Sequence, residues 1–302
     1  MAGHANSLKA ILFALGANFA IFVAKMVAAV ITGSGAMLAE AIHSLADCGN
    51  QGLLLFGMRQ AKRPPSDEHP LGWGKALYFW SFLVAILLFS VGGMFSLYEG
   101  LHKLSEPEPL RAPWLAVGVL VFGIVVEMIS FKACLREVDK LREGRGYWTW
   151  FRHSRNSELI VIFGEDLAAL LGLVLALIAV LLTMLTGNPL FDALGTLSIG
   201  VLLIVIAVLV AVEVKALLIG QGVDPVERRR ILDFLEAQPE VDAVLNLVSL
   251  HMGADVMLSV KARMASQSSD TALVAAINAV EQRLRARFTQ ISWCFFEPDV
   301  AD

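Results

Sequence analysis

The stretch SELIVIFGEDLAALLGLVLALIAVLLTMLT (157–186) and, after Gly187-Asn188-Pro189, the stretch LFDALGTLSIGVLLIVIAVLVAVEVKALLI (190–219) decide the fold of this protein. Each is longer than the run of about 20 mostly apolar residues that a membrane-spanning helix needs. Of the 302 residues, 57% are hydrophobic, whereas a soluble chain is about 45–50% apolar. Because this excess falls in long runs, the sequence predicts an integral membrane protein.

The same pattern recurs along the first two thirds of the chain. We predict six transmembrane helices, at 8–32, 34–58, 76–102, 113–135, 157–186 and 190–219. Basic residues gather in the second-to-third and fourth-to-fifth connections, which the positive-inside rule places in the cytoplasm, together with both chain ends. The sequence shows no Arg- and Ser-rich stretch typical of a transit peptide, so we expect a bacterial inner membrane.

The pattern changes after residue 220. Helical spacing, then period-two alternation, then helical spacing again predict these elements: a helix over 225–237, strands over 244–252 and 256–264, a helix over 273–288 and a last strand over 291–296. This helix–strand–strand–helix–strand order is typical of a small α+β, ferredoxin-like sheet with helices on one face. We expect an all-α six-helix membrane domain at 1–220 and a cytoplasmic domain at 221–302.

Two predicted spans carry ionisable side chains, which are costly inside a membrane and are there by default functional. In the second span, His43 and Asp47 share one helix face, and Glu40 lies three residues before His43. The fifth span contains Glu165 and Asp166. One imidazole and two or three carboxylates suit a divalent transition metal such as zinc, manganese, iron or cobalt. The alternative is that these groups only cross-link helices.

Other classes of function fit the sequence less well. Cys48, Cys134 and Cys294 are far apart and form no Cys-x-x-Cys pair, so a thiolate zinc site or a disulfide framework is not expected. No His-Glu-x-x-His motif points to a membrane metalloenzyme, and nothing indicates a cofactor or a nucleic-acid partner. We expect a transporter rather than an enzyme, with a non-transporting membrane metal sensor as the alternative.

At this point the sequence resembles a known family. The second-span His-x-x-x-Asp, the loop sequence HPLGWGK (69–75), the six spans and the soluble tail are similar to the cation diffusion facilitators. GWGKALYFWS (72–81) and the adjacent Glu165-Asp166 most resemble the subgroup that contains a mitochondrial zinc transporter and its bacterial relatives. The resemblance implies a homodimer in a lipid bilayer, export of a divalent metal ion in exchange for protons, and a four-ligand site between the second and fifth spans.

The resemblance also assigns ligands. His43 and Asp47 match the second-span pair, and Asp166 matches the fifth-span aspartate, whereas the usual fifth-span histidine falls on Ile162. Either Glu165, which we favour, or Glu40 or water completes the metal shell. On a regular helix Glu165 and Asp166 point about 100° apart, so both bind one ion only if the helix is distorted. The loss of one imidazole makes the site harder, which favours manganese or iron more than usual.

Other polar residues are predicted to be structural. Some family members bind metal in the second-to-third loop; here only His69 remains, and we expect it to be structural, with Asp67 and Glu68 as alternative ligands. Because the tail has His251 alone, we predict no binuclear metal site there. Asp192 is predicted to cap the sixth span, and Lys25 and Glu127 to lie near membrane ends or in interhelical pairs.

Overall fold

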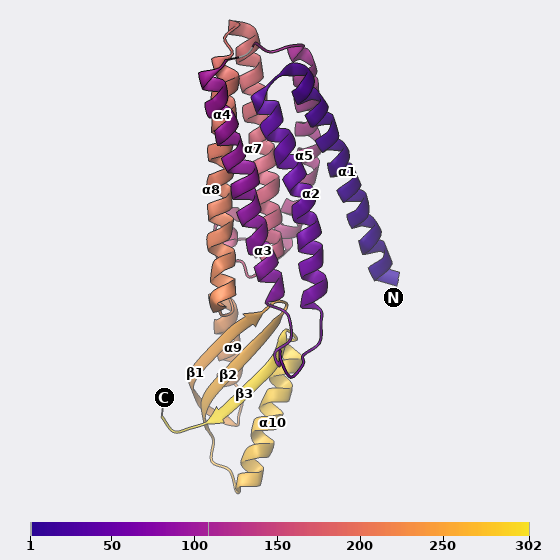
Figure 1. Cartoon of the computed structure of the whole chain (residues 1–302). Helices are drawn as coiled ribbons and strands as arrows, with labels where there is room; N and C mark the ends of the chain where they lie inside the picture. The colour runs from indigo at the N-terminus through magenta and orange to yellow at the C-terminus, as the bar shows by residue number, and fades with distance from the viewer. Residues whose placement is uncertain (1, 108, 302) are drawn as a thin grey trace. The chain divides into compact units, whose positions relative to one another are not determined.

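The computed structural model describes residues 2–107 and 109–301, with side chains described from residue 16 onward except residue 17 (Figure 1). The described chain divides into two compact units. The helical unit consists of Met1–Gly57, Trp80–Phe151 and Ser157–Val214, and the second unit of Met58–Phe79, Arg152–Asn156 and Lys215–Asp302. The second unit therefore combines the C-terminal residues with two connections between helices.

The first two thirds of the chain are helical. The helices are α1 (Ala2–Thr32), α2 (Gly35–Ala61), α3 (Ala76–Leu87), the π-helical segment η1 (Leu88–Met94), α4 (Phe95–Ser105), α5 (Pro113–Leu141), α6 (Tyr147–His153), α7 (Ser157–Thr186) and α8 (Leu190–Gly220). In the helical unit, α5 packs along both α1 and α7 (Figure 1). The predicted ranges agree with these helices, except that η1 interrupts the third and α6 was not predicted.

Four helical stretches of the described chain are long and apolar enough to cross a membrane, which supports a multi-pass integral membrane protein. They are Ala76–Ser105, Pro113–Leu141, Ser157–Thr186 and Leu190–Glu236, the last of which contains α8. Asn18–Thr32 is a shorter apolar helix. The predicted span 34–58 is helical as part of α2, but its polar residues keep it outside this set.

A buried polar cluster ties the start of α2 to α4 and α8. The carboxylate of Asp192 accepts hydrogen bonds from Ser34 Oγ at 2.5 Å and from the backbone N–H of Gly35 at 2.7 Å. Lys103 Nζ lies 3.3 Å from the same carboxylate and also donates to the carbonyl of Gly33. The prediction that Asp192 caps the sixth span therefore needs correction, because this side chain caps α2, a helix that is distant in the sequence.

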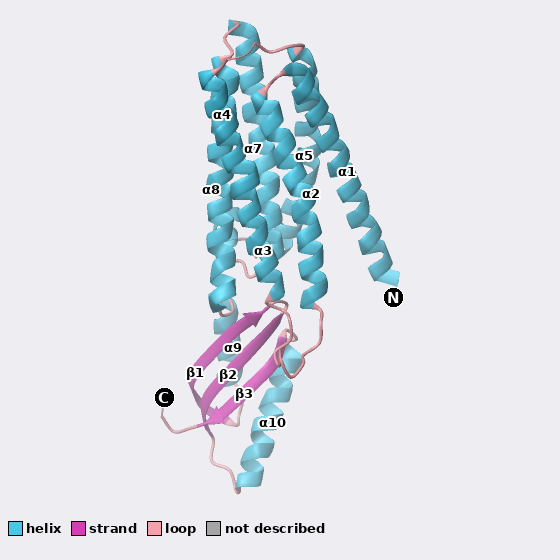
Figure 2. Cartoon of the chain, in the orientation of Figure 1, coloured by secondary structure: helices cyan, strands magenta, loops and turns pink. Residues whose placement is uncertain are grey.

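The C-terminal part forms a three-stranded sheet with two helices (Figure 2). Its elements follow the predicted order: α9 (Pro225–Glu236), β1 (Val241–Met252), β2 (Asp255–Met264), α10 (Asp270–Arg287) and β3 (Ile291–Pro298). β1 and β2 form an antiparallel hairpin, and β3 returns parallel to β2 after α10. The side chains of Asp224 and Ser269 accept hydrogen bonds from backbone N–H groups and so cap α9 and α10.

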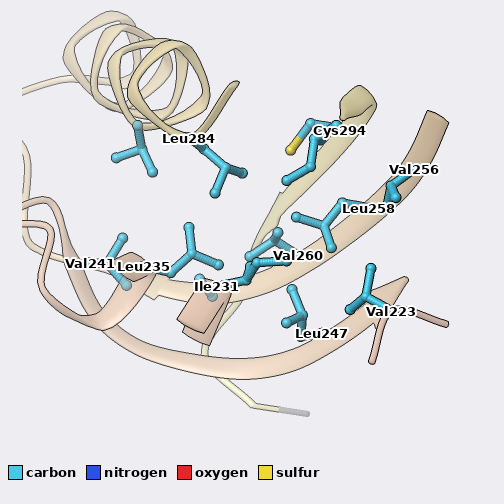
Figure 3. Close-up of a cluster of buried hydrophobic side chains, with 13 residues drawn as sticks. Val223, Ile231, Leu235, Val241, Leu247, Val256, Leu258, Val260, Leu284 and Cys294 are labelled. Carbon is cyan, nitrogen blue, oxygen red and sulfur yellow. The ribbon is translucent and has the colours of Figure 1, made fainter. Parts of the chain in front are cut away.

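The sheet and its two helices enclose one apolar core (Figure 3). Alternate residues of β2 point to this core, as the period-two pattern predicts, and are fully buried: Val256, Leu258, Val260 and Ala262. Ile231 and Leu235 of α9 and Val280 and Leu284 of α10 belong to the same cluster. Because both helices cover the face to which these β2 residues point, the expected one-sided arrangement is observed.

The connection between α2 and α3 meets the β1–β2 turn inside the second unit. The hydroxyl of Tyr78 donates to the carbonyl of Gly253 at 3.2 Å and accepts from the N–H of Gly253 at 3.0 Å. Gly253 has a φ of 84°, which favours glycine, and a Cβ on Gly74 would clash with the backbone of Met252. This close approach explains the glycine at position 74, just before α3.

Candidate metal site

Helix α2 carries an unusual row of buried and half-buried polar side chains. Its spacing of three or four residues puts them near one face of the helix. The row consists of Glu40, His43, Asp47, Asn50 and Gln51. At least one buried polar atom of each has no hydrogen-bond partner among the described residues. Since an unsatisfied buried polar group costs about 1–3 kcal/mol, such a row in one helix indicates a function other than folding.

His43 lies at the centre of this row and is 0% exposed. Neither ring nitrogen has a hydrogen-bond partner among the described residues, and Nδ1 lies 3.7 Å from Oδ1 of Asp47. That separation is too long for a hydrogen bond. It is close to the roughly 3.3 Å between two ligand atoms that each lie about 2.0 Å from a tetrahedral zinc ion. The distance between these two atoms is therefore compatible with contact of both to one ion.

The π-helical segment η1 packs against His43. A Cβ added to Gly92 would lie 3.9 Å from His43 Nδ1 and 3.2 Å from a methyl group of Leu203 in α8. On Gly93 it would lie only 2.6 Å from Ile204. The two glycines thus allow this part of the third span to approach α2 and α8 closely, and π-helical segments are frequent at functional sites.

The two adjacent acids of α7 face different helices. Glu165 is buried and accepts a 2.6 Å hydrogen bond from Asn50 Nδ2 of α2, whereas Asp166 accepts a 3.4 Å hydrogen bond from Ser130 Oγ of α5. This divergence is what a regular helix requires of neighbouring residues. Asp47 lies within electrostatic range of both acids.

Glu40 has a different environment from the other acids. Its Oε2 accepts a 3.1 Å hydrogen bond from Lys25 Nζ of α1, and Lys25 also donates to Ser44 Oγ at 2.8 Å. Its other oxygen approaches α7 so closely that a Cβ on Gly172 would lie 2.3 Å from it. The prediction of an interhelical pair for Lys25 is confirmed. The Glu40 carboxylate is therefore already paired with the ammonium group of Lys25.

The predicted ligands are neighbours, but they do not yet surround one point. No group of three or more His, Cys, Asp or Glu side chains in the part of the chain that the structure describes is close enough to hold a metal ion. Three of the predicted ligands have hydrogen-bond partners from other helices in this structure: Glu165 bonds Asn50, Asp166 bonds Ser130, and Glu40 bonds Lys25. Convergence of all of the predicted ligands on one ion therefore requires side chains to move from their present positions.

The sequence interpretation underestimated Glu127 of α5. Together with Asp47 it lines a small pocket between α1, α2 and α5, which Asn18, Ile21 and Ser44 complete. The pocket is only about as large as one water molecule needs. Glu127 also lies within electrostatic range of Asp166. The sequence did carry a signal for Glu127, because an acid inside an apolar span is costly and therefore suggests a function. Nothing in the sequence, however, indicates that α5 lies next to α2.

The two histidines that were predicted to be structural lie in the second unit. The ring of His69 stacks on Trp73 with 3.8 Å between ring centroids, and the guanidinium of Arg63 lies 5.4 Å from the centroid of the Trp73 ring. His251 lies in β1, where burial and the nearby Arg155 lower its pKa to about 4. Nδ1 of His69 and both ring nitrogens of His251 are buried without a hydrogen-bond partner among the described residues, so the structural role of these histidines stays a prediction.

Comparison with known proteins agrees with this description. The cation efflux transmembrane domain matches residues 11–219. The mitochondrial proton-coupled zinc antiporter SLC30A9 of Xenopus laevis is 34% identical over 247 residues, which are 81% of this chain and 44% of that protein. Metal tolerance protein C4 of Arabidopsis thaliana is 29% identical over 252 residues, or 82% of this chain and 55% of that protein.

A bacterial relative is matched over more of its length. The cation-efflux pump FieF of Salmonella agona is 24% identical over 271 residues, which are 89% of this chain and 85% of that pump. By contrast, the chain spans less than half the length of the SLC30A9 proteins that it matches. Since the efflux domain match covers more than half of the chain, the chain belongs to the cation diffusion facilitator family, whose members are transporters and not enzymes.

Proposed function

We propose that this protein exports a divalent transition-metal ion, most readily zinc, in exchange for protons. The observation that carries the proposal is the row of unsatisfied buried polar atoms on α2, with His43 and Asp47 at ligand spacing and the acids of α7 beside them. A doubly charged ion offsets the charge of such carboxylates, which hydrogen bonds alone do not. The SLC30A9 relatives are named proton-coupled zinc antiporters, which supports zinc and proton exchange.

In the proposed mechanism the ion binds from the inner side of a six-span bundle. His43, Asp47 and Asp166 hold it. Glu165 completes the shell after its hydrogen bond from Asn50 breaks and helix α7 distorts locally, because on a regular helix the two adjacent acids point about 100° apart. Movement of the helices then opens the site outward. Because protonated imidazole and carboxyl groups do not bind metal, protons that arrive on the same side chains release the ion and return with the empty site. The metal is cargo, and the side chains of this chain carry both cargo and protons.

The proposal extends to the protein as a whole. We infer a homodimer in a bacterial inner membrane, with both termini in the cytoplasm, a membrane domain at 1–220 and a cytoplasmic domain at 221–302. The positive-inside distribution of Lys and Arg supports the orientation. The sheet unit, with its own apolar core, supports a separate C-terminal domain.

Flux into proteoliposomes tests this function. Purified protein is reconstituted, a pH gradient is applied, and uptake of zinc is followed with an indicator dye inside the vesicles. His43→Ala and Asp47→Ala should each lower zinc flux by at least about 100-fold, which exceeds the usual effect of an outer-shell residue. His102→Ala and Asp67→Ala, which remove the same groups from exposed positions, should leave flux unchanged. Undiminished flux in the His43 and Asp47 variants would show that the site is wrongly assigned.

The same vesicles decide between metals and between functions. The excess of carboxylates over imidazoles, with Ile162 at the position of the usual histidine, favours harder ions, so manganese, iron and cobalt are tested beside zinc. Flux of one of them in place of zinc would change the cargo but keep the mechanism. Binding of metal without flux of any ion would instead favour a membrane metal sensor.

A further inference from the structure

Lys25 and Glu40 form an ion pair that is enclosed by protein on all sides. Their side chains are 1% and 0% exposed, and Nζ of Lys25 lies 3.1 Å from Oε2 of Glu40. The ammonium group also donates to Ser44 Oγ, so α1 and α2 are joined by two hydrogen bonds from one side chain. Lysine is rarely fully buried unless it is paired, and the pair therefore requires an explanation.

The pair is located directly beside the candidate metal site. Glu40 precedes His43 by three residues on the same face of α2, and Ser44 follows His43 immediately. The free oxygen of Glu40 has no hydrogen-bond partner among the described residues and faces α7 where Gly172 leaves no side chain in the way. Without Lys25, the Glu40 carboxylate would therefore be a third α2 ligand within reach of an ion at His43.

Stability alone does not account for the pair. An apolar pair of similar volume is usually as stable as a buried ion pair or more so, whereas the loss of one partner is strongly destabilising. A buried ion pair can have a functional role when it sets the net charge next to a binding site. Here Lys25 supplies one permanent positive charge at the site, and Glu40 cancels it.

We propose that Lys25 is a positioning residue that keeps Glu40 paired and out of the metal shell, and so limits the number of carboxylates that the transported ion meets. This inference rests on the proposed function. Affinity for divalent ions rises with the number of charged ligands. A transporter must also release its ion, so a site with one carboxylate too many would bind tightly and turn over slowly.

Titration calorimetry of the purified full-length protein with zinc tests the proposal with four variants: Lys25→Gln, Glu40→Gln, the double variant, and Lys103→Gln. In Lys25→Gln the freed Glu40 should tighten zinc binding on the order of tenfold and slow flux. In Glu40→Gln the uncompensated Lys25 should weaken binding on the order of tenfold. The double variant should bind zinc within about threefold of the wild-type protein, because no charge is left over.

Lys103→Gln is the matched control, since it removes the lysine of a second interhelical pair, with Asp192. It should leave zinc affinity unchanged. If Glu40 is itself a ligand, Glu40→Gln and the double variant will both bind zinc weakly, and the proposal is overturned. Unchanged affinity in both single variants would overturn it as well.

Two further variants keep the result decisive. If Lys25→Gln does not fold, the double variant still separates the outcomes, because it lacks the unpaired charge. Lys25→Arg, which preserves the pair, should keep wild-type affinity and flux. His43→Ala reports on the proposed function independently. If this variant binds zinc normally, the metal site is wrongly assigned. If it loses zinc binding while the Lys25 and Glu40 variants keep wild-type zinc affinity, only the role of the pair is overturned.

Discussion

The two units of this molecule bury different kinds of residue. Every polar or charged residue that is buried among the described ones lies in the helical unit; the ionisable members are Lys25, Glu40, His43, Glu165, Asp192 and Glu213. The core of the sheet unit consists of apolar side chains and Cys294. A domain in water gains its stability by excluding polar groups, whereas helices in a membrane gain specificity from the polar groups they share. The buried charges are therefore a feature of the helical unit, where they include both the candidate site and the structural cluster at Asp192.

The strongest expected effect on stability is at the polar cluster of the helical unit. Asp192→Ala removes the carboxylate that pairs with Lys103 and accepts from the N–H of Gly35, and should cost about 3–5 kcal/mol. Thermal unfolding in detergent measures this loss. Asp192→Asn, which keeps one acceptor oxygen, should lose less. A cost of less than about 1 kcal/mol for the alanine variant would mean that this cluster is not a structural tie.

The sheet unit should respond to the loss of apolar volume instead. Leu258→Ala empties part of a core in which that leucine is 0% exposed, and should destabilise the unit by about 3 kcal/mol. Hydrogen exchange of the β1 and β2 amides in the full-length protein provides the measurement. Val248→Ala, at a position of β1 that is 54% exposed, is the control and should change exchange little. Equal effects in both variants would contradict the core assignment.

The sheet unit should also lose stability in acid through one group. Burial first, and then Arg155, lower the pKa of His251 from 6.5 to about 4. The unfolded chain therefore binds a proton between these values that the folded chain does not, and the free energy of unfolding should fall as pH falls from about 6.5 to 4, by on the order of 2 kcal/mol. Below pH 4 this contribution should be constant. Hydrogen exchange as a function of pH measures it, and His251→Gln should remove the dependence. The same slope in that variant would assign the effect to another group.

The smallest expected effect concerns the turn of the sheet unit. Tyr78→Phe removes the hydroxyl that both donates to and accepts from Gly253, and should lower the local stability of the β1–β2 turn by about 1 kcal/mol. Faster hydrogen exchange at the N–H of Gly253 would show this. Tyr98→Phe, which removes a hydroxyl from a residue 68% exposed, is the matched control. Unaltered exchange in Tyr78→Phe would mean that water replaces the hydroxyl without loss.

The candidate site could be predicted only in part. His43 and Asp47 were recognisable because an i, i+4 pair lies on one helix whatever the tertiary fold. Glu165 and Asp166 were recognisable by the cost of acids in an apolar span. The hydrogen-bond partners of the two α7 acids were not: Asn50 of α2 bonds Glu165 and Ser130 of α5 bonds Asp166, and hydrogen bonds between helices leave no periodic signal.

The sequence by itself determined the local structure of this protein. Apolar runs, turn residues and period-two alternation depend on neighbouring residues, so they predicted the long helices, the order of the sheet elements and the ionisable row on α2. Only the tertiary structure decided which charges are already paired. Glu40 faces Lys25, Asp192 caps α2, and Glu127 shares a pocket with Asp47, because the packing of helices that are distant in the sequence sets which side chains meet.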